Sequence, residues 1–192
     1  MSKIGMLRLS NLLGALAVAL TDEIRHAMDN ELEVGGSAAA ALLMVGVEED
    51  AKVEQLARRL QLAQPTMVRT IALLEERGLL RKERTADRRV RPLSLTGKGE
   101  QMVTRLLDRR GSILERLAAA LTSSEQTALT KTLEKLLSAA VRNEDQKYLI
   151  CRLCDENACM PQECPVEHGA AIARARGASA SNAEAAKPRR KG

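Results

Sequence analysis

Four cysteines, all that the chain contains, stand close together near its C-terminal end. They are Cys151, Cys154, Cys159 and Cys164, which gives the spacing Cys-x2-Cys-x4-Cys-x4-Cys. Zn²⁺ binds four thiolates in a tetrahedron, and Cys-x2-Cys is a common half of such sites. The spacing therefore predicts a metal site, with zinc as the first candidate and His168 as an alternative ligand.

The same four thiols allow two other kinds of chemistry. An iron–sulfur cluster is also held by four thiolates, and metal-free thiols can form reversible disulfides. The N-terminus shows no apolar segment followed by a small-residue cleavage site, so we expect no signal peptide and a reducing, cytoplasmic compartment. Zinc, a cluster and free thiols all stay open at this point.

A second group of residues has the side-chain types that read bases in duplex DNA. A helix expected over residues 65–77 has an apolar stripe on one side, formed by Met67, Ile71 and Leu74. On the other side, Arg69 could donate two hydrogen bonds to guanine and Gln64 could bond adenine. Val68 could touch only a thymine methyl group. This side predicts a recognition surface made of Gln64, Thr66, Val68 and Arg69.

Arginines crowd the segment that follows this helix. Residues 79–84 and 90–95 read as two short strands, and residues 85–89 form a charged turn between them, so we expect a hairpin. Pro92 cannot donate to a ladder, which places its strand at an edge. The hairpin would carry basic side chains to the DNA backbone or minor groove. Its candidate residues are Arg84, Asp87, Arg88, Arg89 and Arg91.

Other charged residues have a simpler explanation that is about as good. Asp87 could only fix the turn by pairing with a neighbouring arginine. Arg58, Arg59 and Arg77 fit a solvated helix face as well as they fit a DNA contact.

These residues need a helical scaffold to position them. Apolar spacing predicts further helices over residues 3–28, 37–45, 51–60, 97–121 and about 123–141. The expected N-caps after the first helix are Ser37, Asp50, Thr96, and Ser123 or Ser124. The core must be aliphatic, because the chain has no Trp or Phe and one Tyr. The sequence thus predicts a mainly α fold with a small β-hairpin wing.

The order of elements is that of a winged helix-turn-helix. We expect residues 31–96 to form the DNA-binding domain, and residues 1–30 and 97–146 a helical dimerisation region. The first and last helices carry more apolar positions than one small lobe can cover, and a two-fold partner would cover them. Residues 147–169 would form the Cys-rich segment, and residues 170–192 a disordered basic tail.

Charge and composition favour nucleic acid and disfavour other partners. The formal net charge is +5 and the pI is about 9.2, which suits a polyanionic partner. A single aromatic residue argues against single-strand or RNA binding by base stacking. The longest apolar run, residues 38–47, falls short of the ~18 residues of a membrane span, so no membrane partner is expected. The chain has two histidines and shows no Gly-rich phosphate loop and no nucleophile elbow, so we do not expect enzymatic activity.

Three stretches together resemble the MarR family of bacterial regulators. They are residues 53–66, residues 74–80, and residues 87–96 followed by Gly97 and Gly99. The resemblance covers about residues 5–146. It implies an obligate homodimer that binds a pseudo-palindromic DNA site, mostly as a repressor that a small molecule or an oxidant releases.

The resemblance also assigns residues. It places Gln64, Thr66 and Arg69 on the recognition helix, and Asp87 and Arg89 on the wing. Three positions depart from the family pattern: Gln61 where a Gly is usual, Ala63 where a Ser cap is usual, and Leu73 where a basic residue is common. The Cys-rich segment is an addition to that pattern.

The leading hypothesis is a dimeric regulator that binds double-stranded DNA sequence-specifically and responds to a small molecule, a metal or an oxidant. The alternative is a zinc-stabilised adaptor that binds proteins and not a specific DNA sequence. A thiol oxidoreductase using Cys151 and Cys154 is disfavoured, because the strand-rich scaffold that usually carries such a motif is missing.

Overall fold

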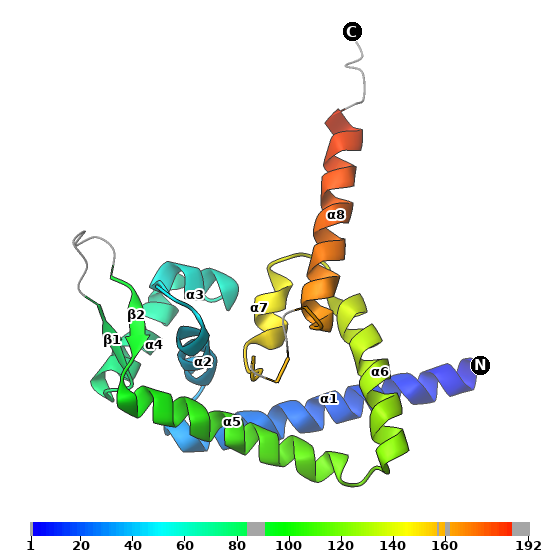
Figure 1. The fold of residues 1–192 in the computed structure, drawn as a ribbon, viewed down its shortest axis with the longest axis horizontal. Coiled ribbons are helices and arrows are strands. Elements are labelled where there is room, and N and C mark those ends of the chain that lie inside the picture. Colours follow the sequence, from blue (N-terminus) through cyan, green and yellow to red (C-terminus); the bar gives the residue numbers. More distant parts are fainter. Residues whose placement is uncertain (1, 84–90, 157, 160–161, 186–192) are drawn as a thin grey trace.

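Two long helices, α1 (Lys3–Leu32) and α5 (Gly97–Ala118), pack against each other (Figure 1). The computed structural model describes residues 2–83, 91–156, 158–159 and 162–185, with side chains as far as residue 176. The remaining elements are α2 (Ala38–Val47), α3 (Val53–Arg59), α4 (Gln64–Glu76), β1 (Leu80–Lys82), β2 (Leu93–Leu95), α6 (Ser123–Ala140), α7 (Gln146–Cys151) and α8 (Pro165–Ala185). The predicted fold class, mainly helical with a small hairpin, is confirmed.

Helix α2 is the centre of the main core. Its sequence is entirely apolar apart from Gly46, and residues 38–45 are all buried. Helices α1, α4 and α5 and strand β2 pack on it, and the four alanines at its start let them approach closely. Burying a side chain such as Leu42 is worth about 1.5–3 kcal/mol, so this helix fixes the positions of its neighbours.

A small two-stranded sheet packs against α2 through strand β2. Strands β1 and β2 pair antiparallel, with Leu80 opposite Leu95. The Leu93 amide donates to the Ala51 carbonyl at 2.8 Å, which adds a short third bridge. Asp50, expected to cap α3, instead has a φ of 58° and turns the chain into this bridge, while Lys52 occupies the N-cap position. That prediction was wrong because the bridge joins residues far apart in the sequence.

The start of α5 is fixed against the end of α4. The Thr96 hydroxyl accepts from the Gly99 amide at 3.0 Å and donates to the Gly78 carbonyl at 2.6 Å, which confirms the predicted cap. Gly78 has a φ of 70°, the left-handed conformation that commonly ends a helix. A Cβ on Gly99 would stand 2.1 Å from the Leu79 carbonyl oxygen, so no larger residue fits there.

Two other helix ends differ from the sequence expectation. Helix α6 is capped by Thr122 rather than by Ser123 or Ser124, because Thr122 and Glu125 form a reciprocal capping box. Hydrogen bonds from the Thr122 amide and hydroxyl lower the pKa of Glu125. Ser37 does stand at the N-cap of α2, but its side chain makes no capping hydrogen bond.

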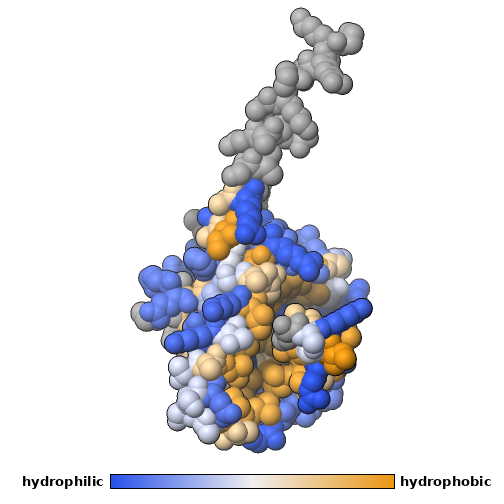
Figure 2. Space-filling view, turned by 90° about the vertical axis from the view of Figure 1, so that its right-hand side faces the viewer, coloured by the Kyte–Doolittle hydropathy of each residue, from blue (hydrophilic) through white to orange (hydrophobic). Residues whose placement is uncertain are grey.

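Large apolar side chains are exposed on α1 and α6. Figure 2 shows apolar surface on the side of the molecule where the N-terminal half of α1 and helix α6 lie. By length and composition alone, α1 could also cross a membrane, and none of its apolar window is buried. This is weak evidence, because helices of soluble proteins and signal sequences pass the same test. The exposed residues are Ile4, Met6, Leu7, Leu9, Leu12, Leu13, Leu16 and Val18 on α1, and Leu129, Leu133, Leu136 and Leu137 on α6.

The C-terminal extension is helical as far as residue 185. Helix α8 packs along α6 so closely that a Cβ on Gly169 would stand 2.5 Å from the Ser138 carbonyl oxygen. Ala170, the next residue of α8, is fully buried. The structure thus has a helix over residues 170–185 where disorder was predicted. At its start, the small residues Gly169 and Ala170 allow the close contact with α6.

Candidate functional site

Helix α4 presents one buried face and one free face. Met67, Ile71 and Leu74 are at most 1% exposed, which confirms the predicted apolar stripe. Pro65 lies in the first turn, where a missing amide proton costs nothing, and Ala63 stands at the N-cap without a side-chain hydrogen bond. The predicted recognition residues Gln64, Thr66, Val68 and Arg69 are all exposed on this helix.

The turn between α3 and α4 is short and tight. Gln61 has a φ of 52°, the left-handed conformation that a glycine adopts most easily. The Leu62 amide then donates to the Ala57 carbonyl at 2.8 Å, and Leu60 is buried beneath the turn. The two helices thus form a helix-turn-helix whose second helix is the exposed one.

Two cationic side chains in the described part of the hairpin are paired with carboxylates. Arg81 donates to Glu83 at 2.7 Å, and Lys82 forms an ion pair with Glu75 of α4. Hydrogen bonds from Ser94 and Arg81 lower the pKa of Glu83. Arg91 is exposed at the described edge of the hairpin. The predicted wing residues Arg84, Asp87, Arg88 and Arg89 lie outside the described residues.

Arg59 has a structural role within the fold. It forms an ion pair with Glu48 at the end of α2, and its guanidinium lies 4.2 Å from the centre of the Tyr148 ring on α7. It therefore joins α3 to two neighbours. Arg58, by contrast, is exposed in the last turn of α3.

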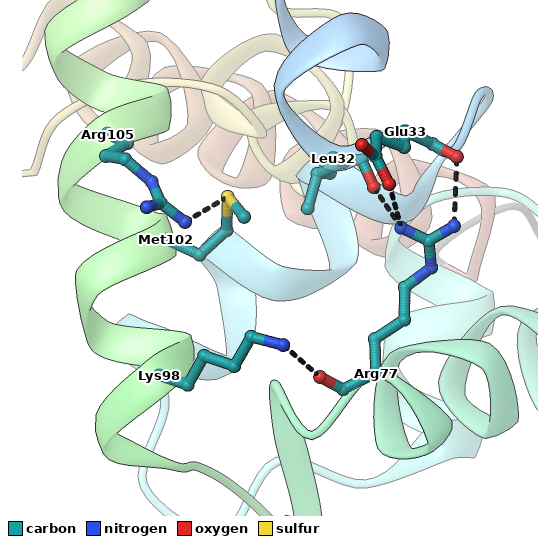
Figure 3. A network of polar contacts seen from close by, with 6 residues as sticks. All are labelled: Leu32, Glu33, Arg77, Lys98, Met102 and Arg105. Atoms are coloured by element: carbon teal, nitrogen blue, oxygen red, sulfur yellow. Dashed lines mark hydrogen bonds and ion pairs between the residues drawn. The ribbon is translucent and has the colours of Figure 1, made fainter.

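Arg77 ties the end of α4 to the end of α1. Its guanidinium donates to the Leu32 carbonyl at 2.6 Å and to the Glu33 carbonyl at 3.1 Å (Figure 3). Its own carbonyl accepts from Lys98 of α5 at 2.8 Å. Arg77 is thus a joint between three helices and not part of a solvated face.

The cysteines gather where α7 ends and α8 begins. Cys151 closes α7, and the Cys154 amide donates to its carbonyl at 2.8 Å in a tight turn. Interaction with the Cys154 thiol, burial and the neighbouring Cys164 thiol raise the pKa of Cys151. Interaction with the Cys151 thiol, together with Arg110 and Arg152, lowers the pKa of Cys154.

The remaining candidate ligands are less enclosed. Cys159 is exposed as a residue. Partial desolvation of its thiol and the neighbouring thiols Cys164 and Cys154 raise its pKa. His168 is exposed in the first turns of α8. Across the described ranges, no three His, Cys, Asp or Glu side chains already stand at the mutual spacing of a bound metal.

A cavity that the sequence did not predict lies beside the start of α4. Its volume is about 710 Å³. It is bounded by α1, α2, the α3–α4 turn and α7, and Thr66 of the recognition helix forms part of its wall. Its lining is mostly apolar, through residues such as Leu20, Ile24 and Leu62, with Arg25, Asp29 and Arg152 as charged groups. Four separate segments build it, so no local pattern could have signalled it.

Several known proteins are similar to this chain in sequence and in fold. The MarR family model matches residues 33–89. The transcriptional repressor MdtR of Bacillus subtilis is 30% identical over 132 residues, which cover 67% of this chain and 85% of that protein. The solved YusO protein of Bacillus subtilis has a TM-score of 0.64 and 25% identity, over 73% of this chain and 100% of its own.

A third relative has been solved with ligands. The Rv2887 protein of Mycobacterium tuberculosis, in complex with DNA, has a TM-score of 0.54 and 23% identity, over 67% of this chain and 96% of its own. It has also been solved in complex with p-aminosalicylic acid. The exposed helix of a helix-turn-helix, the hairpin beside it and these likenesses lead to one conclusion: the chain belongs to the MarR family of winged helix-turn-helix transcriptional regulators.

Proposed function

We propose that the chain acts in the cytoplasm as a dimeric repressor, which binds a two-fold symmetric DNA operator and is released by a small molecule. The observation that carries this proposal is the free face of α4, where Gln64, Thr66, Val68 and Arg69 are exposed opposite a fully buried stripe. A helix with this face enters a major groove about 12 Å wide. The repressor MdtR and the DNA complex of Rv2887 support the assignment.

The residues on this face divide into two roles. Arg69 reads a base by donating two hydrogen bonds to guanine, and Gln64 pairs with adenine. Arg91 and the arginines 84, 88 and 89 of the wing contact phosphates or the minor groove, where they add affinity without much sequence preference. Arg77 and Arg59 take no part in DNA contact, because both side chains are held within the fold.

The dimer rests on the exposed apolar faces of α1 and α6. Leu13 and Leu16 of α1 are 48% and 49% exposed, and Leu133 of α6 is 43% exposed. Leaving such stripes in water is costly, whereas a second copy of the chain would bury both at once. Dimerisation also places two α4 helices at a fixed separation, which is what a palindromic operator requires.

The central test is a substitution at Arg69. The operator is first obtained by selecting bound duplexes from a randomised pool with the full-length protein. Arg69→Ala should then weaken operator binding by about 10–100-fold for each half-site and relax the preference at one base pair. Arg69→Lys is the matched control, because it keeps the charge but loses the planar fork. It should relax the preference in the same way while leaving the salt dependence of binding nearly unchanged.

The outcome also decides between a regulator and an adaptor. A regulator binds duplex DNA with a steep salt dependence, about 0.9 in log–log slope for each phosphate contacted. If the randomised pool yields no preferred sequence and binding does not respond to salt, the zinc-stabilised adaptor replaces the repressor. If Arg69→Ala retains the full base preference, the role given to this side chain is wrong.

The cavity beside α4 is the proposed effector site. Its volume of about 710 Å³ is in the range that holds a drug-sized ligand. A ligand there would touch Thr66 on α4 and Leu20 on α1, so it would change how the recognition helix sits on the dimer frame. Arg25 and Arg152 would pair with the carboxylate of an aromatic acid.

We expect p-aminosalicylate to weaken operator binding by about 5–150-fold, the usual range of such coupling. Thr21→Phe should abolish this response without weakening operator binding, because Thr21 lines the cavity from an exposed position of α1. The control is His26→Phe, an exposed position of the same helix that lies outside the lining. An operator affinity that p-aminosalicylate leaves unchanged in the unaltered protein would remove aromatic acids as the effector class.

A further inference from the structure

The four cysteines lie on neighbouring segments of the C-terminal extension. Cys151 is the last residue of α7, Cys154 and Cys159 are in the loop that follows, and Cys164 immediately precedes α8. Cys151 and Cys154 line one small cavity, and Cys151 and Cys164 pack against the same buried cluster. We propose that the four thiols together bind one zinc ion, and that this ion holds the C-terminal extension against the DNA-binding lobe.

The buried core of the C-terminal extension is too small to stabilise the extension by itself. Its only buried cluster within the described residues consists of Val141, Val166 and Ala170, with Ile150 and two of the cysteines at the margin. A segment of this size generally needs a disulfide or a metal to order it. In a reducing compartment a structural disulfide is disfavoured, whereas a zinc ion bound by four thiolates is stable.

The surroundings suit the charge of such a centre. A zinc ion with four thiolates has a net charge of about −2, which positive neighbours must offset. Arg110 of α5 interacts electrostatically with both Cys154 and Cys159, and Arg152 with Cys154. Arg110 comes from the long helix that carries the DNA-binding lobe, so the charge compensation itself links the extension to that lobe.

One half of the proposed site already has its backbone geometry. The Cys154 amide donates to the Cys151 carbonyl at 2.8 Å, which forms the turn of the Cys-x2-Cys pair. Cys159 is the most exposed of the four, so it is the ligand whose side chain has to change position most on metal binding.

The position of the centre gives the ion a consequence beyond the extension. Cys151 and Cys154 line a small cavity of about 110 Å³ against Met44 and Val47 of α2 and Val103 of α5. On the same short helix, Tyr148 lies over Arg59 of α3. A zinc ion that fixes the end of α7 would therefore fix the face of the helix-turn-helix that is turned away from DNA.

The first experiment measures the metal directly. Full-length protein purified without chelator is expected to contain one zinc per chain and no visible absorption, because Zn²⁺ has a filled d shell. After removal of the metal under reducing conditions, Co²⁺ should bind at one equivalent with the absorption of a tetrahedral thiolate complex. Binding should release protons from the thiols.

Single substitutions test the ligand set. Loss of an outer-shell partner alone weakens metal binding by about 10–100-fold, so Cys159→Ser and Cys164→Ser should each weaken Co²⁺ binding by more than that. Glu163→Gln is the control, because it changes the residue beside Cys164 and leaves every thiol in place. Metal content and Co²⁺ absorption do not depend on DNA, so the test is independent of the repressor assignment.

Three results would overturn the proposal. One is metal-free protein whose Co²⁺ affinity is the same as that of Cys159→Ser. Another is brown protein that contains iron and sulfide, which would make the centre a cluster. The third is protein isolated under reducing conditions with a Cys151–Cys154 disulfide in place of metal, which would make the pair a redox couple.

Discussion

Gly99→Ala should destabilise the protein by about 3 kcal/mol or more, at the upper end of the cost of overpacking a core. The added methyl would stand 2.1 Å from the Leu79 carbonyl oxygen and 3.1 Å from its carbonyl carbon. Both atoms are backbone, so neither can rotate away as a side chain would. The helix has to move off the sheet, which separates α5 from the segment that joins α4 to β1. Denaturant unfolding monitored by circular dichroism measures the loss.

Gly97 provides a matched control two residues earlier in the same helix. A Cβ there would meet nothing within 4 Å. Gly97→Ala should therefore be neutral or stabilise by up to about 1 kcal/mol, since alanine loses less backbone entropy on folding. Equal unfolding midpoints for the two variants would show that the close approach of α5 to Leu79 is not rigid.

Leu133→Glu should convert the proposed dimer to a monomer. Leu133 lies among the exposed leucines of α6, and in a two-fold interface each substitution acts twice. Because Leu133 is 43% exposed in the protomer, losing the burial of the two leucines costs about 1–3 kcal/mol, which raises the dimer dissociation constant by about 10- to 100-fold. Burying the two unpaired carboxylates raises it further. Operator binding should fall with it, because a monomer engages one half-site. Sedimentation measured across a concentration series gives the dissociation constant.

Lys131→Glu is the control for this change. At 100° per residue, position 131 points about 200° away from position 133 on α6, so the same carboxylate is introduced on the other side of the helix. Both residues are exposed. Lys131→Glu should stay dimeric with unchanged folding. A Leu133→Glu protein that remains dimeric at low concentration would show that α6 is not in the interface.

The recognition helix could be predicted from the sequence because its signals are local. Pro65 and Gly78 mark its ends, and the spacing of Met67, Ile71 and Leu74 alone determines which side is buried. Each of these signals acts within a few residues, so no distant contact competes with it.

The errors fall where distant contacts decide the local structure. Asp50 resembles a cap in sequence, but the pairing of Ala51 with Leu93 forces it into a left-handed turn. The segment that begins at Gly169 looks unstructured in sequence, but Gly169 contacts α6 closely and Ala170 is buried there. The approach of Arg110 from α5 towards Cys154 could not be predicted from the spacing of the cysteines.

The joint at Arg77 determines how the recognition helix can move. Arg77 binds two carbonyls of α1 and accepts from Lys98, so the C-terminal end of α4 is held at three points. The N-terminal end, near Thr66, borders a cavity instead. These contacts favour a rotation of α4 about its C-terminal end over a translation of the whole helix. The greatest displacement would then occur near Thr66, so in the proposed dimer a small change in the cavity would alter the distance between the two half-sites.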